Sequence, residues 1–92
     1  MLKEACVENF TNVPGVIERG AKRIELCDNL AVGGTTPSIG VIKITAEYCS
    51  DKDASIIVIL RPRGGDFVYS LMEKAIMMRD LEEITASHAN GI

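Results

Sequence analysis

The residues of this chain best suited to chemistry come directly after a short apolar segment, 56–60, and read Arg-Pro-Arg-Gly-Gly-Asp. Arginine offers a planar charged fork that suits carboxylate and phosphate groups, and glycine lets the backbone approach a ligand closely. The residues expected to bind a small anion are Arg61, Arg63, Gly64 and Gly65. The same pattern also fits a purely structural role, in which the two arginines bond to carbonyl groups of neighbouring loops.

The elements that must position these residues alternate between strands and helices. Apolar segments predict strands over 2–7, 23–27 and 56–60. Helices are expected over 13–20, over 37–49 and from residue 70 toward 88. Such repeated units predict an α/β fold in which a parallel sheet carries helices on one face.

Two of the helices have recognisable start signals. Thr36 is expected to be the N-cap of the second helix, with Pro37 at the first helical position, where a missing N–H costs nothing. Ser70 and Glu73 have the spacing of a capping box for the third helix. Near the end of the chain Asn90-Gly91 predicts a turn, and Ile92 stands where a fourth strand would begin.

Three strand–helix units make only an arc of a sheet. An open parallel sheet with helices on one side leaves its other face and both edges uncovered. We therefore expect residues 1–92 to form a single unit that is the N-terminal part of a larger closed barrel. An isolated arc would be expected to associate with itself through the open sheet edges.

Side-chain alternation separates an apolar face of the predicted sheet from a chemical one. Ile24 and Leu26 share one side of the second strand, and helices are expected to cover that side. The residues expected on the opposite, inward side of the sheet are Glu4, Cys6, Arg23, Glu25, Cys27 and Arg61. Ionisable groups inside a barrel must either neutralise one another as a buried network or serve a site.

Two cysteines on this inward side form a second candidate site. Cys6 and Cys27 are expected at matching late positions on neighbouring strands, which lie about 4.8 Å apart in a sheet. A close thiol pair can bind Cu(I) or form a disulfide, and the alternative is that both are small buried hydrophobes. The third cysteine, Cys49, is expected at the exposed end of a helix and to be incidental. The irregular spacing of the three indicates neither a disulfide scaffold nor a zinc ribbon.

Composition and charge exclude several classes of partner. The chain is 47% hydrophobic and 25% charged, with a formal net charge of -3. Its basic residues are spread along the sequence, so no basic stripe is available to follow a nucleic-acid backbone. No apolar stretch approaches the roughly 20 residues that cross a bilayer, and the N-terminus lacks a signal-peptide pattern. We therefore expect a cytoplasmic protein with reduced thiols.

Four motifs, in order and at suitable spacing, closely resemble the N-terminal part of the CutC copper-homeostasis family. The motifs are Glu4-Ala5-Cys6-Val7, Arg23-Ile24-Glu25-Leu26-Cys27, Gly33-Gly34-Thr35-Thr36-Pro37-Ser38 and the ten residues from Arg61 to Ser70. The resemblance covers nearly the whole chain. It implies a TIM-type (β/α)₈ barrel in a cytoplasmic protein associated with copper tolerance. It also implies that Cys6 and Cys27, at the ends of the first two strands, are ligands of Cu(I).

The chain departs from the family pattern in sequence and in length. Val32 stands where relatives commonly carry Glu, Pro14 interrupts a helix that usually lacks it, and His88 replaces a small residue. A barrel of this type normally takes about 250 residues, so roughly five units are absent from this chain. A site that needs their loops cannot be complete within these 92 residues.

Two functions remain open at this point. The first is copper homeostasis through Cu(I) binding, with copper as the cofactor and no reaction to catalyse. The second is a barrel enzyme that acts on a small phosphate or carboxylate compound at the C-terminal ends of the strands. In that case the candidate catalytic residues are Glu4 or Glu25 as acid or base, with Asp66 orienting the loop.

Overall fold

The computed structural model describes residues 3–92 and contains one parallel sheet with the strand order β1-β2-β3. The strands are β1 (Glu4–Glu8), β2 (Arg23–Cys27) and β3 (Ser55–Val58). All three predicted strands are therefore present, although β3 ends two residues earlier than expected. Leu2, which the sequence placed in the first strand, lies outside the described residues.

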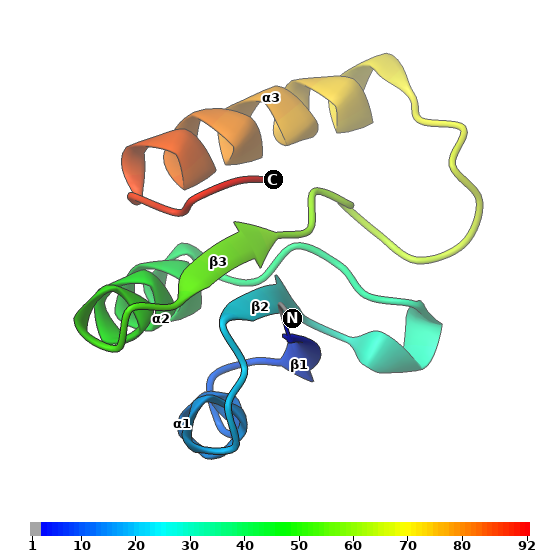
Figure 1. Ribbon diagram of the computed structural model, residues 1–92. Helices are drawn as coiled ribbons and strands as arrows, with labels where there is room; N and C mark the ends of the chain where they lie inside the picture. The colour runs from blue at the N-terminus through cyan, green and yellow to red at the C-terminus, as the bar shows by residue number, and fades with distance from the viewer. Residues whose placement is uncertain (1–2) are drawn as a thin grey trace.

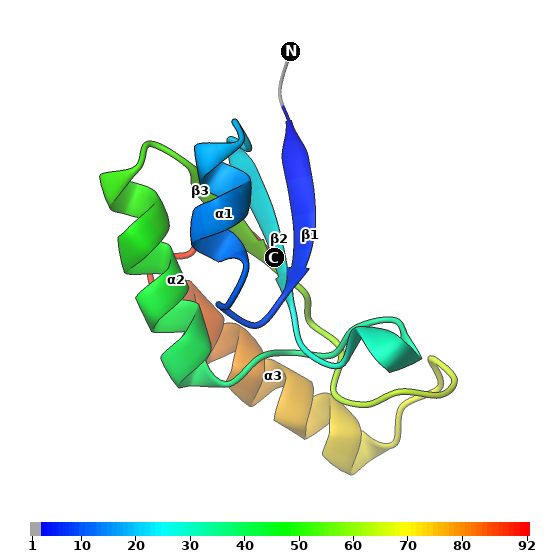
Figure 2. The same cartoon turned by 90° about the horizontal axis from the view of Figure 1, so that it is seen from below.

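A helix follows each strand along the chain, as Figures 1 and 2 show. The helical elements are α1 (Val13–Glu18), the short 3₁₀ turn η1 (Leu30–Val32), α2 (Ile39–Asp51) and α3 (Leu71–Ala86). Pro14 lies in the first turn of α1, where it leaves the helix unbroken. The α/β architecture predicted from the sequence, three parallel strand–helix units, is confirmed.

The hydrophobic core lies between the sheet and the helices. Side chains of all three strands that point to this side are buried, including Val7, Ile24, Leu26, Ile56 and Val58. Ile42, Ala46 and Cys49 of α2 pack against them. The alternation expected for β2 is confirmed, because Ile24 and Leu26 are fully buried whereas Arg23 and Glu25 on the other side are only partly buried.

The start of α2 differs from the prediction. Its N-cap is Ser38, whose hydroxyl accepts a hydrogen bond from the backbone N–H of Val41 at 3.2 Å. Thr36 was expected in this role, but its hydroxyl instead accepts the backbone N–H of Arg61 at 2.9 Å and so joins the loop before α2 to the end of β3. Pro37 consequently precedes the helix. Local capping preference could not reveal this contact because the two residues are 25 positions apart.

The start of α3 agrees with the prediction. Ser70 and Glu73 form a complete capping box, in which the Ser70 hydroxyl accepts the Glu73 N–H and the Glu73 carboxylate accepts the Ser70 N–H. Most side chains of the helix are at least partly exposed. Ile84 is its only buried residue, and several apolar side chains are exposed: Leu71, Met72, Ile76 and Met78.

The last residues of the chain lie beside β3. The backbone N–H of Val58 donates to the carbonyl of Gly91 at 3.1 Å, and Gly91 forms a parallel bridge with Ile57. In Figure 1 this segment runs between α3 and β3. The chain thus enters the position of a fourth parallel strand, as the sequence predicted. Among residues 3–92, no helix is long and apolar enough to span a membrane.

Candidate functional site

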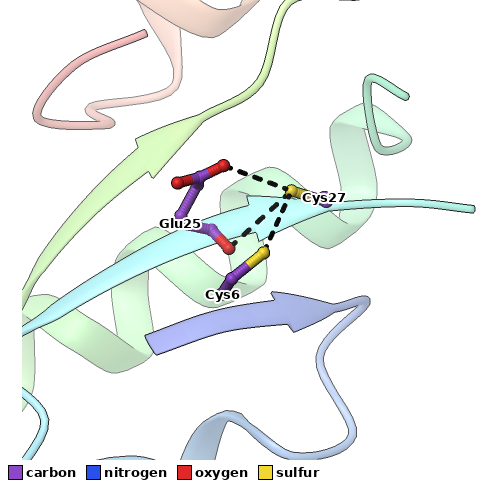
Figure 3. Close-up of side chains that lie close together, drawn as sticks. All are labelled: Cys6, Glu25 and Cys27. Carbon is purple, nitrogen blue, oxygen red and sulfur yellow. Dashed lines mark hydrogen bonds between the residues drawn. The ribbon is translucent and has the colours of Figure 1, made fainter. Parts of the chain in front are cut away.

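Two thiols meet on the face of the sheet that the helices leave open. The Sγ atoms of Cys6, from β1, and Cys27, from β2, are 3.8 Å apart, and both cysteines are free thiols (Figure 3). The prediction that the two cysteines stand at matching positions was wrong by two residues, because Cys6 is in register with Glu25 and Cys27 with Glu8. The sulfurs therefore meet diagonally across the two strands, within the reach expected for neighbouring strands.

A carboxylate completes this group. The Cys27 thiol donates to Oε1 of Glu25 at 3.9 Å and to the Glu25 backbone carbonyl at 4.0 Å. One ligand atom from each of Cys6, Glu25 and Cys27 lies within 4.8 Å of the other two. The sequence placed Glu25 on the same face as both cysteines but assigned it to a buried charge network or to acid–base chemistry. Its spacing of two residues from Cys27 on one strand was the signal that could have grouped it with the thiols.

The two thiols differ in their surroundings. Cys27 is only 1% exposed, whereas Cys6 is exposed. Burial, followed by the hydrogen bond with Cys6 and the charge of Glu25, raises the pKa of Cys27 to about 12. The loop before α2 contributes to this burial, since a Cβ atom at Gly34 would lie 3.5 Å from the Cys27 sulfur. Gly34 adopts a φ of +97°, a conformation that favours glycine.

The prediction that Cys49 is exposed was wrong. Its side chain is fully buried in the core between α2 and the sheet, and this burial raises its thiol pKa. The helix ends two residues beyond Cys49, and the following chain folds back so that the Ala54 N–H donates to the Cys49 carbonyl at 2.9 Å. Cys49 therefore has a packing role on the opposite side of the sheet from the thiol pair.

Arg61 is buried and bonds to loop carbonyls. One of its terminal nitrogens donates to the carbonyls of Val32 at 2.6 Å and Gly34 at 3.1 Å, and the other to Gly65 at 2.9 Å. Its guanidinium also lies 4.9 Å from the ring centre of Phe67. The side chain thus ties the loop after β2 to the loop after β3. Its Nε atom is buried without a hydrogen-bond partner among the described residues.

Arg63 is held by acidic side chains rather than by carbonyls alone. It forms ion pairs with Glu73 and Asp66, and it donates to the backbone carbonyl of Gly64 at 3.0 Å. The carboxylate of Asp66 also accepts the N–H of Val68 at 3.1 Å, so it shapes the loop. Both arginines of the segment therefore already donate to the protein, and anion binding by Arg61, Arg63, Gly64 and Gly65 stays a prediction.

The other charged side chains on the inward face of the sheet form one ion pair and not a four-residue network. Arg23 pairs with Glu4 across β1 and β2, while both side chains remain partly exposed. Arg61 does not join this pair, and its two terminal nitrogens donate to loop carbonyls instead. Glu25 stands apart from the pair, beside the thiols. A network uniting Glu4, Glu25, Arg23 and Arg61 is thus absent from the described residues.

The sequence and the fold are both similar to known proteins. The sequence model of the CutC family matches residues 1–92. A protein of Enterococcus faecalis strain V583, named family protein CutC, is 53% identical over 92 residues, which are all of this chain and 44% of that protein. A human protein named copper homeostasis protein cutC homolog is 38% identical over 91 residues, covering 99% of this chain and 32% of that protein.

A solved structure extends the similarity to the fold. A crystal structure of a CutC protein from Streptococcus agalactiae matches this chain with a TM-score of 0.94 and 45% sequence identity. The match covers 99% of this chain and 43% of that one. The chain therefore spans less than half the length of the relatives that it matches, and its three strand–helix units have the same arrangement as the matching part of that structure.

Proposed function

The chain belongs to the CutC family, and from this premise we propose that it serves copper homeostasis by binding Cu(I) between Cys6 and Cys27. The observation that carries the proposal is the 3.8 Å separation of two free thiols on adjacent strands. Soft thiolate ligands favour Cu(I) over harder cations. The names of relatives such as the human and Dictyostelium discoideum proteins refer to copper homeostasis, which supports the choice of metal.

The protonation of Cys27 makes Cu(I) binding depend on pH. Its thiol is buried and is held protonated by its raised pKa, about 12. Metal ligation requires the thiolate, so Cu(I) must displace the Cys27 proton. The affinity of the site for Cu(I) should therefore increase as the pH rises.

The proposed role is binding, and it belongs in the cytosol. Thiols stay reduced in the cytosol, and the pair needs to be reduced to hold the metal. Cys6 and Cys27 supply the sulfur ligands, and the proposal requires no acid, base or nucleophile. The protein takes up and releases the ion without changing it chemically. The quantity that matters is therefore the affinity of the site for Cu(I) and not a reaction rate.

A competition titration tests the proposal. The reduced protein is titrated anaerobically with Cu(I) in the presence of a chromophoric Cu(I) chelator, and the affinity and stoichiometry are measured. We expect a single Cu(I) per chain and a loss of affinity of at least about tenfold in Cys6→Ser and in Cys27→Ala. Cys49→Ala is the matched control, since it removes a thiol outside the site. Unchanged affinity in both site variants would overturn the proposal.

A further inference from the structure

We propose that Cys6, Glu25 and Cys27 form a three-donor site that also binds a divalent zinc ion, with Glu25 as the oxygen ligand. The inference concerns a second metal and rests on the same thiol pair as the proposed copper site. The three side chains come from two adjacent strands and converge on the open face of the sheet, as Figure 3 shows. The site has no Cys-x-x-Cys motif, because its two thiols are 21 residues apart in sequence.

The separation of the sulfurs favours a bent coordination geometry. With metal–sulfur bonds of about 2.3 Å, two sulfurs arranged linearly around a metal would be about 4.6 Å apart. The observed separation is 3.8 Å. At that separation and bond length the angle at the metal is about 110°, which is the tetrahedral angle that zinc adopts with protein ligands. The sheet register therefore presents the thiols at the spacing of a tetrahedral site.

The third donor matches zinc better than it matches copper. Oε1 of Glu25 lies 3.9 Å from the Cys27 sulfur, and a small side-chain movement would bring it to coordination distance. Zn²⁺ accepts carboxylate oxygen together with thiolate sulfur, whereas Cu(I) selects soft sulfur ligands. Glu25 should consequently contribute strongly to zinc binding and weakly to Cu(I) binding.

A fourth ligand and the balance of charge complete the description of the zinc site. A water molecule commonly takes the fourth position of a zinc ion that has three ligands from the protein. Two thiolates and one carboxylate carry three negative charges, which a divalent ion balances better than a monovalent one. Binding replaces the thiol protons by the metal and releases them to solvent.

The test compares both metals in the same set of variants of the full chain. Zn²⁺ affinity is measured under reducing conditions by competition with a chromophoric zinc chelator, and Cu(I) affinity is measured as above. We expect Glu25→Gln to weaken Zn²⁺ binding by about tenfold or more while changing Cu(I) binding by less than about threefold. Glu47→Gln removes an exposed acid of α2 and is the control for a change in net charge. Circular dichroism of each variant verifies the fold.

X-ray absorption at the zinc edge gives a readout that does not depend on affinity. The wild-type protein should show two sulfur neighbours near 2.3 Å and oxygen neighbours near 2.0–2.2 Å. Equal Zn²⁺ affinity in wild type and Glu25→Gln, or a zinc ion without the two sulfurs, would overturn the inference. Cu(I) binding that persists in that case leaves the proposed function intact. Zinc binding without Cu(I) binding would overturn the proposed function and support the inference.

Discussion

The two faces of the sheet have opposite properties although they are made by alternate residues of the same three strands. On the helix-covered face, Ile24, Leu26 and Val58 are completely buried. On the open face, Cys6 is exposed and Glu25 is partly buried, and the ligand atoms of both lie close to the sulfur of Cys27. Burial of apolar area stabilises the fold, whereas accessible polar atoms are what a ligand requires. The comparison indicates that stability and the proposed metal binding depend on different side chains.

The largest expected effect tests this division directly. Ile24→Ala removes a completely buried side chain from the helix-covered face, so we expect the free energy of unfolding to fall by about 2–5 kcal/mol. Ile57→Ala is the matched control, because Ile57 occupies the neighbouring strand but points to the open face and is only partly buried. Urea denaturation of the two variants measures the difference. Equal losses would show that the faces do not differ in this way.

Arg61 is a charged residue whose expected role is structural, so it tests whether every charged side chain near the open face serves ligand binding. Arg61→Met would leave the carbonyls of Val32, Gly34 and Gly65 without their donor, and we expect a loss of about 2–3 kcal/mol. Arg61→Lys keeps the charge but not the planar fork, so it should recover only part of this loss. Urea denaturation again supplies the measurement. A lysine variant as stable as wild type would mean that charge alone matters at this position.

The strand assignment could be predicted from sequence more fully than the site could. Alternation along β2 correctly separated Ile24 and Leu26 from Glu25 and Cys27, because a strand turns each successive side chain to the other face. The pairing of Cys6 with Glu25 rather than with Cys27 depends on the register between strands, which alternation on one strand does not determine.

Bonding of the arginines to loop carbonyls was one of the two roles that the sequence offered, but local patterns did not identify which carbonyls accept from Arg61. The carbonyls that accept from Arg61 belong to two separate loops. One of them, that of Val32 in the loop after β2, is 29 residues from Arg61 in sequence. The same tertiary approach takes Thr36 out of its expected capping role, since its hydroxyl accepts the Arg61 N–H. Local preferences predicted the Ser70 and Glu73 capping box because both partners lie within a single helical turn.

The smallest expected effect concerns a partly exposed ion pair beyond the sheet. Arg63 and the Ser70 N–H hold the Glu73 carboxylate, and they lower its pKa to about 2 from an ordinary value of 4.5. Because the folded protein binds this proton less tightly than the unfolded chain does, Glu73 stabilises the fold above pH 4.5. This contribution is lost as the pH falls from 4.5 toward 2.

Urea denaturation at a series of pH values measures this contribution. Stability should decline more steeply for wild type than for Glu73→Gln over this range, since the amide has no proton to gain. Glu82→Gln, which removes another exposed acid of α3, should keep the wild-type slope. The effect should also shrink at high salt, because the pair is solvent-accessible and its charges are screened. Parallel pH profiles for wild type and Glu73→Gln would show that this partly exposed pair adds nothing to the stability that burial provides.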